Sequence, residues 1–492
     1  MKVLLAFFFN VIFNFAIGLL VAKFLGPEEY GRFALAFATA GIVQAGFFDW
    51  LRLGAVRFYS ERVRSEDPTL RATLDVCFAW IAFGILTGGA LLLVSGAHFA
   101  LSNWLIGLAL GTAIANGFFD FHTALVRARF HDKLYTRLII VKNILALCLT
   151  GGSAYWFHSA RMALIGSIIS MLGSVIAARA ALHDPGTLAH HARRAVAKAI
   201  LRYSAPIVAA NLLYVAIPLV NRSIIAVLFG FSETGQFSLA YDIGNKAVQA
   251  LGSTLDVVLF QIAVAAHERD GVLQAKAQIA RNMAIVIAVV LPACTGLWLI
   301  LPSLEQVIVP VAYRGPFGDL LTLMMGGLFS SAIIQYGLNP IFQIAKKTVP
   351  VIAAAAVGCV VDVVLLLVLP RTSDASSFAI AQTGAYVAAL VALIFVASFS
   401  KPQWPSLRDL AAIVFATGAM TAVLLPLREH HPGFLTLLEQ VVAGAVIYTL
   451  LVAAFNIAGL RTVFYAKLRA RGSAASSAPG EPPEQKEDAQ NP

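Results

Sequence analysis

Charged residues are scarce in this sequence. Only 13% of its 492 residues are Asp, Glu, Lys or Arg, whereas a soluble domain carries roughly 25%. The stretches that do hold charges are too short to bury a hydrophobic core of their own. A soluble chain of this length would form domains of about 150 residues, and the composition excludes that architecture.

Cysteine is equally rare, and its four copies show neither a metal nor a disulfide pattern. Cys77, Cys148, Cys294 and Cys359 all fall inside apolar segments and lie far apart in the sequence. We expect them to act as small hydrophobic residues. The sequence also lacks a P-loop, a His/Cys cluster and a nucleophile motif. We therefore expect no metal, no cofactor and no catalytic residue.

Long apolar runs take the place of these features, and 59% of the residues are hydrophobic. A helix needs about 20 apolar residues to cross a bilayer. Because lipid cannot hydrogen-bond to the backbone, such spans must be helical. The runs lie at 3–22, 33–55, 74–95, 104–125, 138–157, 162–182, 204–228, 237–264, 283–302, 318–337, 350–369, 377–398, 410–427 and 434–458. The predicted fold is an all-α integral membrane protein with about fourteen transmembrane helices, the first of them retained rather than cleaved as a signal peptide.

Lys and Arg gather at alternate ends of the predicted helices. The basic ends include residues 57–71, 127–137 and 193–202, whereas the opposite ends hold few basic residues. Because basic loops stay in the cytoplasm, we expect both termini to be cytoplasmic in a bacterial inner membrane. The same rule accounts for the net charge of +10, so we expect no nucleic-acid partner. Residues 461–492 are rich in Ser, Pro and Glu and predict a disordered cytoplasmic tail.

One short sequence occurs twice. Residues 24–36 read FLGPEEYGRFALA and residues 228–240 read LFGFSETGQFSLA, at a constant offset of 204. The shared pairs are Gly26/Gly230, Glu29/Glu233, Gly31/Gly235, Phe33/Phe237, Leu35/Leu239 and Ala36/Ala240. Each copy follows the first helix of a six-helix unit, which favours two parallel lobes related by an axis along the membrane normal over a chance similarity between two glycine-containing turns.

These positions predict the domain organisation. The expected units are an N-lobe at 1–203, which includes a basic cytoplasmic connector, and a C-lobe at 204–400. Two extra helices follow at 401–460. Two facing lobes are the arrangement of an alternating-access transporter.

Four motifs resemble a known family. They are LGPEEYG after the first helix, Arg57-Phe58-Tyr59-Ser60-Glu61 after the second, Asn221-Arg222 in the seventh, and the Gly-x-Phe/Tyr-x-x-Ala step at Gly235–Ala240. Together they resemble the polysaccharide transporter family, the O-antigen and exopolysaccharide flippases of the multidrug/oligosaccharidyl-lipid/polysaccharide exporter superfamily, over about residues 3–460. The family usually has Asp-Arg where this chain has Asn221-Arg222.

The resemblance implies a function. Such a flippase moves an undecaprenyl-pyrophosphate-linked oligosaccharide from the cytoplasmic to the periplasmic leaflet, and it is not an enzyme. The implied partners are this substrate, a coupling proton or sodium ion, and the polysaccharide polymerase and chain-length machinery.

Cationic side chains inside the spans are the candidate ligands of the pyrophosphate, because a charge in lipid is costly unless it is paired or faces water. Arg52 either pairs with Asp49 on the same helical face or faces a cavity. Arg222 has no acid three or four residues away, so it meets either substrate or an acid on another helix. Lys246 either binds substrate or forms a local pair with Asp242.

Asn14 is the fourth candidate ligand. With Asn10 and Gly18 it forms a seam with a four-residue period, which suits helix packing as well as substrate contact. Acids in the spans are the candidate carriers of a coupling ion. They are Asp49, Asp120, Asp242, Asp256 and Asp362.

Two other functions stay open at this level. A drug/cation antiporter with the same fold would need an acidic or apolar cavity. A membrane polymerase or glycosyltransferase would need catalytic groups in large outside loops, but the largest, about 303–317, holds only Glu305 and Arg314. Glu28 and Glu29 look like a catalytic acid pair, yet the repeat keeps only one acid, which favours a turn or cap role.

Overall fold

The computed structural model describes residues 2–96, 99–184, 187–344, 349–370, 374–428, 431–459 and 461, and every regular element among them is helical. The helices are α1 (Lys2–Phe47), α2 (Asp49–Phe58), α3 (Glu61–Glu66), α4 (Pro68–Val94), α5 (Asn103–Ala128), α6 (Asp132–Leu145), α7 (Gly152–Phe157), α8 (Ala160–Ala177), α9 (Arg179–Leu182), α10 (Arg194–Leu228), α11 (Phe231–Val307), α12 (Pro316–Ala332), α13 (Asn339–Ile344), α14 (Val349–Val368), α15 (Ser376–Phe399), α16 (Leu407–Arg428) and α17 (Phe434–Phe455). Single π-helical turns join α6 to α7 and α12 to α13. The predicted all-α membrane fold is confirmed, while the predicted disordered tail falls on residues 462–492, outside the described residues.

Twelve helical stretches in the described chain are long and apolar enough to cross a membrane. Two of them are interrupted by a glycine with a non-helical backbone, α1 at Gly26 and α11 at Gly271. If each interrupted stretch is counted as two helices, the twelve become fourteen. The number of crossings and the lobe boundaries stay predictions.

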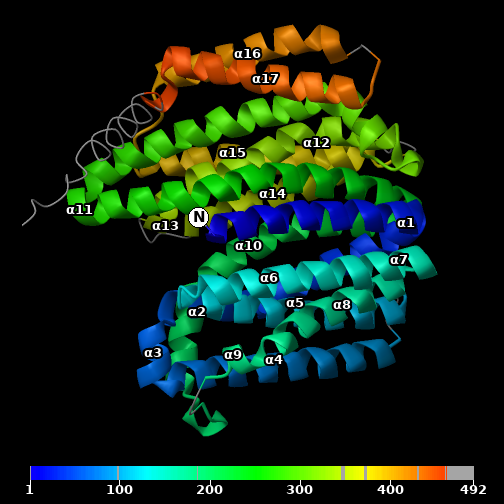
Figure 1. Cartoon of the computed structure of the whole chain (residues 1–492), viewed down its shortest axis with the longest axis vertical. Coiled ribbons are helices and arrows are strands. Elements are labelled where there is room, and N and C mark those ends of the chain that lie inside the picture. Colours follow the sequence, from blue (N-terminus) through cyan, green and yellow to red (C-terminus); the bar gives the residue numbers. More distant parts are fainter. Residues whose placement is uncertain are drawn as a thin grey trace, which may run out of the picture.

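The helices run side by side in two groups (Figure 1). The lower group in that view holds α2–α9, and the upper group holds α11–α15, with α1 and α10 lying between them. The last two helices, α16 and α17, pack on the outer side of α11, away from the lower group. Helix α1 contacts α11 and α10 on one side and α5, α6 and α8 on the other, so it joins the two groups.

Several helices begin earlier than the apolar runs predict. The third span starts at Pro68 instead of residue 74, with Asp67 as its N-cap, and α10 starts at Arg194 instead of residue 204. These first turns carry polar and charged residues, which a helix can hold where it leaves the lipid. The predicted helix 33–55 is also interrupted, because α1 ends at Phe47 and α2 starts at Asp49.

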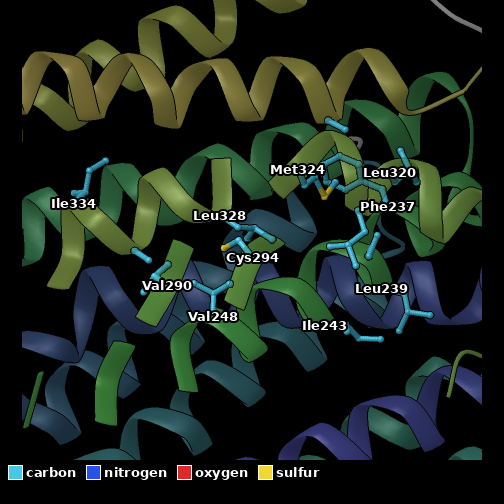
Figure 2. Close-up of a cluster of buried hydrophobic side chains, with 14 of the residues drawn as sticks. Phe237, Leu239, Ile243, Val248, Val290, Cys294, Leu320, Met324, Leu328 and Ile334 are labelled. Carbon is cyan, nitrogen blue, oxygen red and sulfur yellow. The ribbon is translucent and has the colours of Figure 1, made fainter. Parts of the chain in front are cut away.

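The largest buried cluster is built mainly from the upper group and α1 (Figure 2). Phe237 in the first half of α11 lies beside Leu320 and Met324 of α12, and Val290 in the second half of α11 lies beside Val248. Apolar side chains on the outer surface are exposed instead, such as Leu367 at 79%. This arrangement is the one expected when lipid, and not water, surrounds the bundle.

The repeated sequences have the same backbone structure. Gly26 has φ 70° and ψ 171°, and the equivalent Gly230 has φ 87° and ψ 179°. Only glycine adopts this region without strain. Each glycine ends one helix and the next helix begins directly after it, so the two turns are structural equivalents.

A buried ion cluster holds the Lys/Arg-rich end of the lower group together. The Asp184 carboxylate, 2% exposed, accepts hydrogen bonds from Arg64 (2.6 Å) and from the Tyr59 hydroxyl. The guanidinium groups of Arg71 and Arg129 each approach it to 3.7 Å. Because Asp184 follows α9 while the cations come from α3, α4 and α5, this acid ties the connector to the helix ends.

Candidate functional site

A cavity of about 740 Å³ lies between the two groups of helices. Its walls come mainly from α1, α6, α10, α11 and the segment around α13. Its polar lining includes Asn14, Gln44, Asp49, Arg52, Asn116, Lys142, Asn211, Arg222, Asp242, Asn245, Lys246, Gln249 and Asp256. Polar groups at this depth are costly unless they face water or a ligand, so the cavity is the candidate site.

The two repeat turns close the Lys/Arg-poor end of this cavity. A Cβ atom added to Gly31 would lie 1.9 Å from the carbonyl oxygen of Phe231, and one added to Gly235 would lie 2.0 Å from the carbonyl oxygen of Pro27. The helices therefore touch backbone to backbone, which only glycine allows. Close approach is therefore the role of Gly31 and Gly235, whereas Gly26 and Gly230 form the turns themselves.

Aromatic residues add a second layer to this closed end. The Tyr313 hydroxyl donates a buried hydrogen bond to the carbonyl oxygen of Ala22 (3.2 Å), and its ring meets Tyr30 edge-on. The guanidinium of Arg32 lies 5.2 Å from the ring centre of Phe231. Contacts between α1 and the second half of the chain thus seal this end.

The opposite end of the cavity is open. The Arg52 side chain there is 41% exposed and Asp256 is half-buried, whereas Tyr30 near the closed end is 4% exposed. Solvent therefore reaches the cavity from the Lys/Arg-rich end.

Arg222 is ion-paired with an acid on another helix, which is one of the two alternatives that its sequence environment leaves open. Its Nη2 atom lies 2.5 Å from Asp242 Oδ1, and its guanidinium lies 5.4 Å from the ring centre of Tyr241. The Tyr30 hydroxyl approaches the other Asp242 oxygen to 3.5 Å. Arg222 lines the cavity, but its charge is already balanced.

The predicted local ion pair between Asp242 and Lys246 is not formed. Their four-residue spacing permits contact, but Asp242 turns to Arg222 on α10, and the Lys246 ammonium points to α1. There it lies 3.5 Å from the carbonyl oxygen of Asn14. Spacing along one helix could not reveal which neighbouring helix offers the better partner.

Asn14 belongs to a polar network and also lines the cavity, so its two expected roles coexist. Its amide donates to Asn10 at 2.7 and 2.8 Å, and its Oδ1 accepts from the Lys142 ammonium at 3.0 Å. Asn143 accepts from the same ammonium at 2.9 Å and donates to Asn10 at 3.0 Å. The seam on α1 is thereby bonded to α6.

The pair of Asp49 and Arg52 is formed, and both residues also line the cavity. Arg52 Nε lies 3.1 Å from Asp49 Oδ1, and Asn211 adds a 3.5 Å contact to the same carboxylate. Arg52 is thus held by Asp49 at the open end.

The remaining candidate acids occupy different surroundings. Asp256 lines the cavity. Asp120 is not part of the lining, and it accepts a 2.7 Å hydrogen bond from Gln44. Asp362 on α14 is 2% exposed, accepts from Asn221 at 3.2 Å, and has no cation within 4.0 Å in the described chain. No group of three possible metal ligands was found among the described residues.

Two features were missed in the sequence. Lys142 is a lone lysine in an apolar run and is not among the four candidate ligands, although it lines the cavity. The cluster around Asp184 gave no local signal, because its members lie more than a hundred residues from that acid or on other helices.

Comparison with solved structures identifies the fold. The lipid II flippase MurJ in an inward closed conformation matches with a TM-score of 0.66 and 14% identity, covering 92% of this chain and 98% of that chain. An inward-facing multidrug resistance MATE family transporter of the MOP superfamily matches with a TM-score of 0.59 and 17% identity, covering 80% and 96%. A MOP superfamily transporter from Pyrococcus furiosus matches with a TM-score of 0.53 and 16% identity, covering 81% and 93%. The fold is therefore shared with these proteins.

Comparison with curated protein sequences found no match. A family profile described as "Polysaccharide biosynthesis protein" matches residues 20–313. The match includes the first repeat turn, the second repeat turn and most of the cavity lining. Because it spans more than half of the sequence, the chain belongs to this family of polysaccharide biosynthesis proteins.

Proposed function

We propose that the protein is a flippase for a lipid-linked oligosaccharide. It moves an undecaprenyl-pyrophosphate-linked sugar chain from the cytoplasmic to the periplasmic leaflet of a bacterial inner membrane, for O-antigen or exopolysaccharide synthesis. The observation that carries the proposal is the polar cavity between two groups of helices in a polysaccharide biosynthesis protein. Polar side chains suit sugars, and cations suit pyrophosphate.

The shape of the cavity supports alternating access. It is closed at the Lys/Arg-poor end by the repeat turns and open at the Lys/Arg-rich end. With basic ends in the cytoplasm, this is the state that admits a substrate from the cytoplasmic leaflet. Opening toward the periplasm requires the turns around Gly31 and Gly235 to separate. In this orientation, with the basic ends in the cytoplasm, both termini are cytoplasmic.

A drug/cation antiporter is less well supported. The charged lining residues are four cations and three acids, namely Arg52, Lys142, Arg222, Lys246, Asp49, Asp242 and Asp256. A site with an excess of positive charge repels a cationic drug and attracts an anion.

An enzyme is also less well supported, because the acids of the outside loops have structural roles. Glu305 accepts the backbone N–H of Gly315 (2.5 Å), and Arg314 donates to the backbone of the same loop. Glu28 and Glu29 both pair with Arg32, and Glu29 also accepts a backbone N–H at the start of α8.

Ion coupling and assembly belong to the proposal as well. Asp362 is the best candidate for binding a proton or a sodium ion, because its described hydrogen-bond partner Asn221 offers it no positive charge. The polysaccharide polymerase and chain-length machinery are the proposed partners on the periplasmic side.

Reconstitution tests the function. The purified chain is placed in liposomes with a fluorescent undecaprenyl-pyrophosphate oligosaccharide, and a membrane-impermeant reductant measures how much label changes leaflet. We expect the wild type to move label and Arg222→Ala to fail, while Arg161→Ala, an exposed arginine at the opposite end, stays active. Efflux of a cationic drug without lipid movement would favour the antiporter instead.

A further inference from the structure

The cavity contains two kinds of cation. Arg52 and Arg222 each have a carboxylate partner, at 3.1 and 2.5 Å. Lys142 and Lys246 have none: no described Asp or Glu oxygen lies within 4.0 Å of either ammonium. Yet Lys142 is only 9% exposed, so its charge sits away from bulk water. A buried charge without a counter-ion is unfavourable and marks a place for an anion.

Both ammonium groups point at the same residue. Lys142 donates to the side-chain oxygen of Asn14 (3.0 Å), and Lys246 lies 3.5 Å from its backbone oxygen. Lys142 comes from α6 and Lys246 from α11, while Asn14 lies on α1 between them. All three residues line the cavity.

Hydrogen-bonding capacity is left over at both lysines. An ammonium has three donors. Lys142 uses two of them, on Asn14 and Asn143, and the one contact of Lys246 is long. The present acceptors are neutral amide oxygens. An anion would accept stronger hydrogen bonds from the two ammonium groups, because donor and acceptor would both be charged. The acids that act on them, Asp120 on Lys142 and Asp242 on Lys246, lie beyond 4.0 Å.

We propose that Lys142 and Lys246, one from each group of helices, form a diphosphate-binding site with Asn14 between them, and that Arg52 and Arg222 hold the cavity walls instead of binding the anion. A diphosphate spreads its negative charge over two phosphorus centres, so it can meet two separated cations at once. This assignment rests on the proposed function, since the diphosphate is that of the lipid-linked substrate.

Gly18 leaves the room that this site needs. A Cβ atom at this position would lie 3.0 Å from the Lys246 ammonium, which is tighter than ordinary contact. A larger side chain on α1 would displace that ammonium from Asn14. Gly18, which the sequence placed in a packing seam, therefore shapes the site.

Binding of inorganic pyrophosphate, inorganic phosphate and a short-chain polyprenyl pyrophosphate to the full chain in nanodiscs tests the proposal. We expect Lys142→Gln and Lys246→Gln each to weaken pyrophosphate binding roughly tenfold to a hundredfold, the range of a lost hydrogen bond to a charged group. The preference for pyrophosphate over phosphate should fall as well. Lys142→Arg should restore much of it, and Lys133→Gln, an exposed lysine, is the matched control.

The outcomes separate the site from the function. A variant that is merely misfolded loses both anions alike, and rescue by Lys142→Arg excludes that reading. Wild-type-like binding by both Gln variants would overturn the site even if the wild type transports lipid. Lysine-dependent binding of the polyprenyl pyrophosphate without any lipid movement would support the site and refute the flippase. Pyrophosphate binding that the polyprenyl compound cannot displace would overturn the assignment to a lipid substrate.

Discussion

Alanine at Gly31 or Gly235 should open the end of the cavity that the repeat turns close. Neither glycine has a positive φ, so alanine fits the local backbone of both helices. In a helix alanine is even favoured over glycine by up to about 1 kcal/mol. The substitution therefore penalises only the state in which the two turns touch.

The clash sets the size of the effect. The added Cβ would lie 1.9 Å from the Phe231 oxygen in one variant and 2.0 Å from the Pro27 oxygen in the other, whereas real Cβ contacts stay beyond 3.0 Å. The turns must separate by about 1 Å, and backbone atoms on both sides cannot rotate away. Overpacking of this kind costs about 1–3 kcal/mol, which shifts a two-state equilibrium by roughly 5- to 150-fold.

Cysteine labelling measures this shift. Ala38 lines the cavity, and Ala38→Cys in a background without the four native cysteines provides the probe. A membrane-impermeant maleimide is added from the periplasmic side. We expect Gly31→Ala and Gly235→Ala to raise the labelling rate several-fold or more over the probe alone.

The control variant is Gly41→Ala on the same helix, where a new Cβ meets nothing within 4 Å. It should leave labelling unchanged. If Gly31→Ala labels no faster than Gly41→Ala while folding normally, the turns are not the gate. A fall in thermal stability without faster labelling would mean that the contact only packs the bundle.

Three further predictions concern charges. Arg222→Ala should abolish polysaccharide export at normal protein levels, and Arg222→Lys should restore it only in part, because an ammonium keeps the charge beside Asp242 but loses the planar guanidinium near the Tyr241 ring. Asp184→Asn should lower the stability of the purified protein by about 1–3 kcal/mol, because Arg64 and Tyr59 lose their charged acceptor while the arginines keep Glu61 and Asp75; detergent denaturation measures this. Burial acts to raise the pKa of Glu61, but the hydrogen bonds and positive charges of Arg64 and Arg129 together outweigh it and leave the pKa lowered. The contacts of the Glu61 carboxylate with its arginines therefore stabilise the fold above about pH 4.3, and this stabilisation is lost as the pH falls through the lowered pKa of Glu61. The melting temperatures of wild type and Glu61→Gln should therefore converge in acid.

Features set by local chemistry were predictable from the sequence. Apolar runs revealed the all-α membrane fold, because a span must be long and apolar whatever it packs against. The repeat was also visible, since Gly26 and Gly230 occupy a backbone region closed to other residues. Helix starts such as Pro68 were missed, because hydropathy marks only the part of a helix inside lipid.

Features set by contacts between helices were not predictable. Asp242 has a lysine one turn away and still pairs with Arg222 on α10. Lys142 gains its importance only because α6 lies beside Asn14 of α1. Spacing on one helix identifies which side chains share a face, but it carries no information about the helix opposite.

The contact between the repeat turns is self-complementary. Gly31 approaches the oxygen of Phe231 and Gly235 approaches that of Pro27, and residues 27 and 231 are themselves equivalent at the offset of 204. Residue i of one copy meets residue j of the other and j meets i, which is the isologous pattern of a two-fold homodimer. A single ancestral half could have made this same contact with a second copy of itself. In the fused chain, a change that enlarges one turn is therefore best compensated in the other, and the two glycines should vary together among relatives.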